Sequence, residues 1–466
     1  MKLNIKIRRK KNGVSVSYSN GSNGSGAKSG VDGIRDVALM AHERSMGKIE
    51  IIGKVPVTTL RDLAIYYTPG VSYPSLEIKE DKKLSYVYTA RANRIAVISD
   101  GSRVLGLGNI GPEAGLPVME GKSLLFKKFG NVDALPLVVR AETTEELVAI
   151  AKAIEPGVGG INLEDISSPK CFEVFERLQK ELSIPVFHDD REGTAVVTLA
   201  ALQNALKIVG KEISSAFIVI NGAGAAGVGI AQLLLAAGAA NIVMCDKRGI
   251  LYKGRTDNMN NIKELLAEHT NRNLLKGQLV DAVKNCDVLI GASSEGAFNE
   301  RLIRSMAPRA IVFALANPDP EITYNEAKAA GAEVVATGAS NVPNQINNVL
   351  AFPAIFRGAL DVQARKINTQ MLLAAADALS SNVQKAKLNS EHIVPNFSDD
   401  DINSITAVVA AEVAKAAMET GVSRIKVDPA LIRKNTSVAL MRYSKLEKSF
   451  SKAASGRSFS SKFFKR

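Results

Sequence analysis

One glycine-rich segment limits the possible folds of this 466-residue chain more than any other feature. An apolar run at residues 216–220 leads into Gly222, Gly224 and Gly227, and a second apolar run follows at once. This order is typical of a strand, a tight turn and a helix whose N-terminus faces a dinucleotide pyrophosphate. A strand that is apolar along its whole length needs cover on both faces. The segment therefore predicts a parallel sheet with helices on both sides.

Strand-like and helix-like segments alternate along most of the chain, which supports the same fold class. The alternation runs over residues 134–209 and again over residues 216–338, and residues 345–440 carry a helical pattern. Repeated units of this kind favour helices packed on parallel sheets. We therefore expect an α/β fold with an N-terminal α/β domain and a Rossmann-type NAD(P)-binding domain. The C-terminal helices are expected to pack back on the first domain.

Five segments follow from these patterns. They are a flexible basic extension at 1–31, a first domain at 32–190, a nucleotide domain at 191–357, C-terminal helices at 358–444 and a basic tail at 445–466.

Two hairpins are also expected. Apolar residues alternate on both sides of Asn12-Gly13, and two apolar runs flank Asp100-Gly101. Asn-Gly and Asp-Gly are common hairpin turns.

Positive charge is concentrated at the two ends of the chain. The net charge is +12, of which residues 1–31 contribute +7 and residues 445–466 contribute +6. The part between them is close to neutral, so nucleic-acid binding would depend on the ends alone. Trp is absent, which disfavours a base-stacking surface. We expect no specific nucleic-acid partner and keep one distant alternative, a non-catalytic binding module that uses the basic ends.

The cysteines and the hydropathy indicate where the protein works. Cys171, Cys245 and Cys286 show no paired spacing, which is typical of buried thiols in a reducing compartment. No apolar run approaches the roughly 20 residues of a membrane span, and no secretory signal is recognisable. We expect a cytoplasmic protein without a membrane span, and an organellar presequence stays open.

The glycine segment can be matched to a nucleotide in more detail. The residues expected around the pyrophosphate are Gly222, Ala223, Gly224, Ala225, Ala226 and Gly227. Asp246 ends the next apolar run, where a carboxylate would bind the ribose hydroxyls of NAD. Lys247 and Arg248 follow it and could instead bind the 2′-phosphate of NADP. NAD is slightly favoured, and both cofactors stay open.

Two acidic pairs close apolar runs upstream of the glycine segment. They are Glu164-Asp165 and Asp189-Asp190. Such runs end where α/β proteins place their ligands, and Mg²⁺ and Mn²⁺ prefer carboxylate oxygens. Glu164, Asp165 and Asp190 could therefore hold a divalent cation. The alternatives are solvated loop acids, or a cap at Asp189 or Asp190 for the helix expected near Thr194.

Six motifs in a single order closely resemble the malic enzyme family in its shorter prokaryotic and archaeal form. They are YYTPGVSYPSLEI, SDGSRVLGLGNIGPEAGLPVMEGKSLLFKKFG, GINLEDISSPKCFEVFERL, PVFHDDREGTAVV, FALANPDPE and PNQINNVLAFPAIFRGALD. The resemblance covers residues 32–440 and leaves both ends outside it. It implies oxidative decarboxylation of L-malate to pyruvate and CO₂ with NAD(P)⁺ and Mn²⁺ or Mg²⁺. It also implies a homodimer or a multiple of dimers.

The same resemblance implies the catalytic residues. It places the metal on Glu164, Asp165 and Asp190. It makes Lys122 the general base that takes the hydroxyl proton of malate, and Tyr67 the acid that protonates the enol. Without the resemblance, Lys122 would be interpreted as a solvated surface lysine and Tyr67 as a packed aromatic residue.

Four more residues receive roles by resemblance. Arg103 would hold a malate carboxylate. Asn317 and either Asn347 or Asn348 would line the pocket for substrate and nicotinamide. By their local sequence alone, Arg103 would be an exposed residue after a turn and Asn317 would initiate a turn before a proline.

One position departs from the family pattern. Many short-form members read DDQHGTA, whereas here Asp190 is followed by Arg191 and Glu192. The reaction expected from the resemblance is unchanged, but the charge beside the metal is different. We expect a structural role for His188, because strand alternation points it away from Asp189. A malolactic-type or plain oxaloacetate decarboxylase on the same fold is the alternative function.

Overall fold

The computed structural model describes residues 4–10, 13–19, 31–395 and 402–454, and they belong to two compact units. The smaller unit contains the residues up to Lys48. Its strands β1 (Asn4–Lys10) and β2 (Gly13–Ser19) pair antiparallel, as the first expected hairpin requires, and helix α1 (Val31–Ser45) follows. All of the candidate site residues lie in the larger unit.

A four-stranded parallel sheet carries the first half of the larger unit. Its strands are β3 (Arg94–Ser99), β4 (Asp133–Val138), β5 (Gly160–Leu163) and β6 (Val186–His188), in the order β4-β3-β5-β6. Helices α5 (Gly111–Gly130), α6 (Thr144–Ile154) and α7 (Lys170–Glu181) connect them. Each crossover is long enough for a helix, which is why neighbouring strands run parallel.

The second expected hairpin, at Asp100-Gly101, is wrong. β3 lies in the interior of the sheet, and its two edges pair with β4 and β5. The segment after Gly101 therefore has no free edge of β3 to pair with. It forms instead a small loop closed by the bond from Val104 N–H to Gly108 O (2.9 Å), with the 3-10 turn η3 (Leu105–Leu107) inside it.

A six-stranded sheet forms the nucleotide half. Its order is β12-β11-β10-β7-β8-β9, parallel except for the short β9 at the edge. The strands are β7 (Phe217–Asn221), β8 (Asn241–Asp246), β9 (Gly249–Ile250), β10 (Val288–Gly291), β11 (Ile311–Ala314) and β12 (Val334–Thr337). The helices are α8 (Thr194–Val209), α9 (Ala225–Ala236), α10 (Asn261–His269), α11 (Leu279–Ala282), α12 (Glu300–Arg304) and α13 (Tyr324–Ala329). The strand order reverses at β7, as in Rossmann-type domains.

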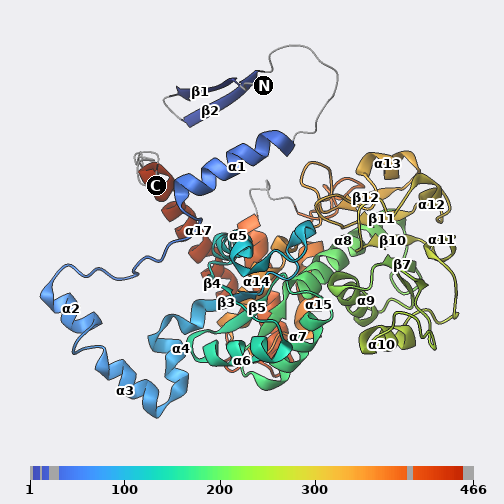
Figure 1. The fold of residues 1–466 in the computed structure, drawn as a ribbon. Helices are drawn as coiled ribbons and strands as arrows, with labels where there is room; N and C mark the ends of the chain where they lie inside the picture. Colours follow the sequence, from blue (N-terminus) through green and yellow to red (C-terminus); the bar gives the residue numbers. More distant parts are fainter. Residues whose placement is uncertain (1–3, 11–12, 20–30, 396–401, 455–466) are drawn as a thin grey trace. The chain divides into compact units, whose positions relative to one another are not determined.

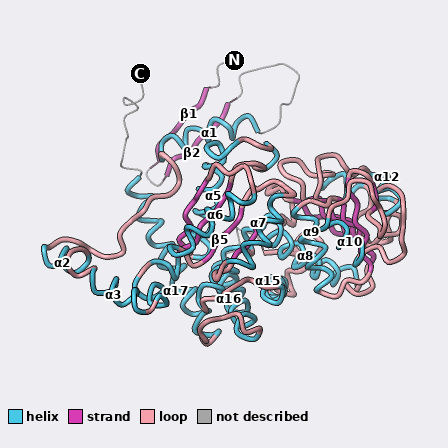
Figure 2. Tube along the Cα trace, turned by 60° about the horizontal axis from the view of Figure 1, so that its bottom comes forward, coloured by secondary structure: helices cyan, strands magenta, loops and turns pink. Residues whose placement is uncertain are grey.

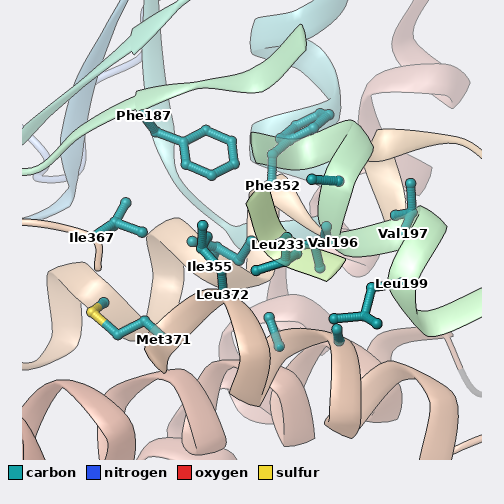
Figure 3. Close-up of a cluster of buried hydrophobic side chains, with 14 of the residues drawn as sticks. Phe187, Val196, Val197, Leu199, Leu233, Phe352, Ile355, Ile367, Met371 and Leu372 are labelled. Carbon is teal, nitrogen blue, oxygen red and sulfur yellow. The ribbon is translucent and has the colours of Figure 1, made fainter. Parts of the chain in front are cut away.

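Four C-terminal helices return to the first half, as expected. They are α14 (Phe352–Asp361), α15 (Thr369–Ser381), α16 (Ile402–Glu419) and α17 (Pro429–Ala454). Phe126 of α5 contacts Phe352 of α14, with ring centroids 4.5 Å apart. Lys128 of α5 bonds to Glu447 of α17 at 2.7 Å. Helix α17 continues beyond the boundary expected at residue 444. The buried cluster in Figure 3 joins side chains of β6, α8, α9, α14 and α15 into one core.

The segment before β3 forms an arm that leaves this body (Figures 1 and 2). It holds α2 (Leu60–Tyr66), α3 (Ser72–Glu80) and η1 (Lys82–Leu84), and α4 (Ser85–Tyr88) and η2 (Ala90–Asn93) lead back to the body, where Asn93 bonds to the carbonyl oxygen of Asn131. Thr59 and Asp62 form a capping box at the start of α2, which stabilises the helix locally. No residue of α2 or α3 is buried.

Candidate functional site

Four acidic side chains meet at the carboxyl edge of the four-stranded sheet. Glu164 and Asp165 follow β5 directly, and Asp189 and Asp190 begin the π-helical turn η5 (Asp189–Gly193) after β6. β5 and β6 are parallel neighbours, so both pairs leave the sheet at the same edge. One carboxylate oxygen each from Glu164, Asp165 and Asp190 lies within 4.8 Å of the other two. Hard oxygen donors at this spacing fit one Mg²⁺ or Mn²⁺.

Hydrogen bonds within the strand ends hold these carboxylates in place. Asp165 has a φ of +53°, a left-handed conformation that is uncommon for a residue with a side chain. Its N–H donates to Asp190 Oδ2 at 3.0 Å, and its carbonyl oxygen accepts from Arg103 N–H at 3.0 Å. Asn162, buried in β5, donates to Glu164 Oε2 at 2.8 Å. These hydrogen bonds fix the positions of the Glu164 and Asp190 carboxylates.

Lys122 lies among these acids. Its side chain is 9% exposed, and its Nζ lies 2.8 Å from Glu164 Oε1 and also forms an ion pair with Asp189. The ammonium lies 4.4 Å from the centroid of the Phe352 ring. Helix α5 packs across β3 and β4, and this packing takes Lys122 out of solvent. The reading of Lys122 as a solvated surface residue is therefore wrong.

The charges of this cluster shift one another's pKa values. Burial favours the neutral amine of Lys122, but the carboxylates of Asp189 and Glu164 outweigh burial and raise its pKa. Burial raises the pKa of Glu164 well above its usual value, and the neighbouring acids add to the rise against the effect of Lys122. Burial likewise raises the pKa of Asp189. Four acids around one base leave the cluster short of positive charge, and a divalent cation would supply it.

Asp189 and Asn348 also belong to the cluster. Asp189 is fully buried, pairs with Lys122, and accepts a hydrogen bond from Asn348 Nδ2. The sequence left Asn347 and Asn348 as alternatives, and the structure separates them, because Asn347 caps the short helix η6 (Asn348–Leu350). From the sequence, Asp189 was placed in an acidic pair and as a possible helix cap, but it was not assigned to the site. Its available signal was its place in an acidic pair at the end of a buried strand.

The side chains of three other expected residues lie outside the acidic cluster. Tyr67 caps the C-terminus of α2 and is 65% exposed, and α2 lies on the arm, apart from β5 and α5 (Figure 1). Arg103 has an exposed side chain, and only its backbone reaches Asp165. Asn317 is exposed, and its amide group packs against Gly338, where an added Cβ would lie 2.7 Å from Oδ1.

His188 lies behind the acidic turn. It is 1% exposed and contacts Phe175 edge-on, with ring centroids 6.3 Å apart. Burial lowers the pKa of His188 to about 4, and burial raises the pKa of Glu192 to about 7. Neither ring nitrogen has a hydrogen-bond partner in the described chain. This environment suits a packed, neutral imidazole.

The glycine segment forms the turn between β7 and α9, where the strand order reverses. Gly222 has a φ of +130°, and a Cβ there would lie 2.2 Å from the carbonyl oxygen of Ala292. A Cβ on Gly227 would lie 2.0 Å from the carbonyl oxygen of Gly222, so helix and strand approach too closely for any side chain. At Gly224 the space is open. These are the three requirements of a pyrophosphate-binding turn.

Asp246 ends β8 as predicted, but its carboxylate is already engaged. Oδ2 accepts from Arg255 at 2.6 Å, Lys263 at 2.7 Å and Asn258 at 2.8 Å, and Oδ1 accepts from the N–H of Arg248 at 2.8 Å. Burial raises the pKa of this carboxyl, but the bonds outweigh burial and keep the pKa below its usual value. Two cations on one carboxylate leave this end of β8 positive.

Comparison with known proteins identifies the family. A family described as "Malic enzyme, N-terminal domain" matches residues 46–179, and one described as "Malic enzyme, NAD binding domain" matches residues 192–418. This chain belongs to the malic enzyme family. A relative from Bacillus subtilis, named "Bifunctional malic/malolactic enzyme", is 50% identical over 86% of this chain and 98% of its own length. The NAD-dependent malic enzyme of Geobacillus stearothermophilus is 49% identical over 81% of this chain and 78% of its own length.

Solved structures of malic enzymes have the same fold. The malic enzyme from Pyrococcus horikoshii matches with a TM-score of 0.86 and 45% identity, over 90% of this chain and 99% of that one. The malic enzyme from Entamoeba histolytica matches with a TM-score of 0.86 and 36% identity, over 92% of this chain and 90% of that one. Among the described residues, no helix is both long and apolar enough to cross a membrane.

Proposed function

We propose that this chain catalyses the oxidative decarboxylation of L-malate to pyruvate and CO₂, with reduction of NAD(P)⁺. The observation that carries the proposal is the cluster of Glu164, Asp165 and Asp190, in which Glu164 pairs with the buried Lys122, packed against the nucleotide half. Gly229 of α9 touches the turn that carries Asp190, since an added Cβ would lie 2.3 Å from the carbonyl oxygen of Arg191. The helix that follows the nucleotide turn thus abuts the acidic site.

Glu164, Asp165 and Asp190 would hold the divalent cation. Bound there, Mg²⁺ or Mn²⁺ would polarise the ketone of oxaloacetate and stabilise the enolate left when CO₂ departs. The protein's own contribution is to fix the three oxygens. Asn162 orients Glu164, and the backbone of Asp165 orients Asp190.

Lys122 would take the hydroxyl proton as hydride leaves C2 of malate. Only the neutral amine can act as a base, and the ion pairs with Glu164 and Asp189 stabilise the ammonium. If Glu164 no longer pairs with Lys122, the lysine keeps only Asp189 as a carboxylate partner. The pKa of Lys122 then falls toward its ordinary value. Asn348 would keep Asp189 in place during this change.

Tyr67 would protonate the enol, and we propose that a second copy of the chain supplies it. A general acid must reach the reacting carbon, whereas Tyr67 lies on the exposed arm. The arm is rich in uncovered apolar side chains, and Ile51, Leu60 and Tyr73 are 92%, 86% and 70% exposed. Apolar surface of this kind marks an interaction site. In a two-fold dimer, the arm of each copy would reach the site of the other.

Substrate and cofactor contacts complete the proposal. Arg103 would bind a malate carboxylate, and Asn317 and Asn348 would face the substrate and the nicotinamide. The positive surroundings of Asp246 favour a 2′-phosphate more than its position alone suggested, so we propose that NADP is accepted at least as well as NAD. Lys247 and Arg248 would supply the cations.

Turnover with L-malate tests the function directly. The purified chain with Mn²⁺ should release pyruvate and CO₂ and form one reduced nicotinamide for each malate. Rates with NAD⁺ and NADP⁺ should differ by less than about 10-fold if the end of β8 accepts both, which corresponds to about 1.4 kcal/mol. Lactate formation without net reduced nicotinamide would instead establish a malolactic reaction. Turnover of oxaloacetate but not of malate would leave only the decarboxylase.

A further inference from the structure

A cavity next to η5 is not used by the proposed reaction. It has a volume of about 270 Å³ and lies among α7, η5, α9 and the first residues of α15. Leu233, Ile367 and Leu372 form its apolar side, and Figure 3 shows these residues in the buried core cluster. The cavity is thus built on a packed core and is large enough for a small ligand.

Arg191 presents a fixed guanidinium to this cavity. Its Nη2 donates to Gln232 Oε1 at 2.6 Å, and its Cζ lies 5.0 Å from the centroid of the Phe175 ring. Its Nη1 is buried and has no hydrogen-bond partner in the described chain. A buried charged donor without a partner carries an energetic penalty, which a bound acceptor would remove. Arg191 is also one of the residues that depart from the family pattern.

Lys366 is the second cation that lines the cavity. Lys366 is exposed and forms no ion pair within the described residues. Thr369 begins α15, where Asn368 already caps the N–H of Met371. Glu192 is the one carboxylate that lines the cavity, and its Oε2 accepts the N–H of His188 at 3.2 Å. Two cations against one carboxylate leave the cavity positive.

We propose that this cavity binds a small oxyanion, a carboxylate or a phosphate, on Arg191 and Lys366. The guanidinium fork suits two oxygens of such a group, and Lys366 adds a second charge from the loop that precedes α15. The apolar side accommodates a short carbon chain. Because Arg191 directly follows Asp190 and its carbonyl packs on α9, the ligand would contact the turn that joins the acidic site to the nucleotide half.

Calorimetric titration of the full-length protein tests this site without malate, metal or nucleotide. Inorganic phosphate and succinate are titrated separately in chloride buffer, and at least one of them should bind saturably. Arg191→Gln should weaken that binding by about 10-fold, and Lys366→Gln by about 3-fold, since hydrogen bonds to charged groups are worth more than neutral ones. Binding of phosphate alone or of succinate alone identifies the chemical class.

Two controls separate this site from other anion sites. Lys385→Gln removes the same charge beyond the far end of α15 and should leave the affinity unchanged. Arg103→Gln alters the proposed malate contact and should also leave it unchanged. The proposal is overturned if neither anion binds, if Lys366→Gln binds as tightly as the unmodified chain, or if Lys385→Gln or Arg103→Gln weakens binding equally. Lys366 is exposed, so its variant decides the question even if Arg191→Gln fails to fold.

Discussion

The acidic cluster and the arm carry the two halves of the proposed acid–base chemistry, yet they are built in opposite ways. Lys122 is paired with Glu164 and Asp189 inside the body, and its side chain is 9% exposed. The two helices on either side of Tyr67, α2 and α3, have no buried residue, and the Tyr67 side chain is exposed to solvent. One region is buried within the chain, whereas the other leaves its apolar side chains exposed.

This difference is what the proposed sharing of one active site between two copies would require. Parallel strands end at the same edge of a sheet, so folding of the chain by itself brings the acids at their ends together. A short helix on an arm has only local stabilisation, such as the capping box at Thr59 and Asp62. Its apolar residues would be buried when a partner binds. If the two regions meet between two copies, each site combines Lys122 of one copy with Tyr67 of the other.

The largest effect is expected from the acid–base pair. Lys122→Ala and Tyr67→Phe should each lower kcat by about 10²- to 10⁴-fold, because each removes a proton-transfer group. Mixing the two variants under conditions that exchange subunits should restore about one quarter of the activity, because mixed dimers keep one intact site. No recovery on mixing, with exchange verified, would place Tyr67 in the site of its own chain.

Removal of the divalent cation should lower turnover about as much as the Lys122 and Tyr67 substitutions do. EDTA should stop the reaction and added Mn²⁺ should restore it, because the carboxylate cluster lacks compensating positive charge. Asp190→Asn should weaken Mn²⁺ binding, measured by electron paramagnetic resonance, by at least about 10-fold. Glu176→Gln, an exposed acid on α7, is the matched control. Equal Mn²⁺ affinity in the two variants would refute the site.

A charge introduced on the arm should weaken dimer assembly without unfolding the body. Leu60→Lys, at a position that is 86% exposed, should lower the dimer fraction in sedimentation and reduce turnover at low protein concentration. The unfolding temperature of the body should be unchanged. Leu265→Lys, on the exposed face of α10, should alter neither quantity. A Leu60→Lys protein that stays dimeric and active would show that the arm is not the interface.

The two neighbouring asparagines offer a smaller test of the buried region. Asn348→Ala should lower kcat/KM by about 10-fold, since the buried carboxylate of Asp189 loses one of its two side-chain donors and keeps only Lys122. Asn347→Ala should instead cost about 1 kcal/mol of stability through its lost cap, with little change in kcat. Steady-state kinetics and urea unfolding on both variants check this. Identical effects of the two substitutions would contradict the separation of roles.

The smallest effect concerns the attachment of the arm. Asp133 pairs with Lys127 of the body at 2.8 Å and with Lys54 of the arm at 3.4 Å. Burial raises the pKa of Asp133, but its hydrogen bonds and cations outweigh burial and lower it. The stabilisation is therefore present above the usual pKa of 3.8 and is lost as pH falls below it.

Asp133→Asn should accordingly lower the unfolding free energy by about 1 kcal/mol or less at neutral pH, because the pair is partly exposed and screened. The difference from the unmodified chain should shrink as the pH falls through about 4 in urea titrations. Lys54→Ala should have a smaller effect than Lys127→Ala, since Lys54 is the more exposed partner. A difference that grows in acid would contradict the assigned sign.

Much of this protein could be predicted from local pattern. Apolar runs bounded by glycines and acids located β5, β6 and β7, so Glu164, Asp165, Asp190 and the glycine turn were found at strand ends. Those positions depend on neighbours in sequence, because a parallel strand ends where its apolar run ends. The Asp100-Gly101 hairpin failed for a tertiary reason, since β3 has its two edges occupied by β4 and β5.

Other features were decided only by tertiary structure. Packing of α5 against the sheet turned Lys122 from an ordinary lysine into a buried partner of Glu164 and Asp189. The path of the chain after β12 places Asn348, and not Asn347, in contact with Asp189 of the acidic cluster. Sequence pattern determines where an element ends, because that choice is local. Which side chains then meet depends on segments far apart in the chain, and no local pattern contains that information.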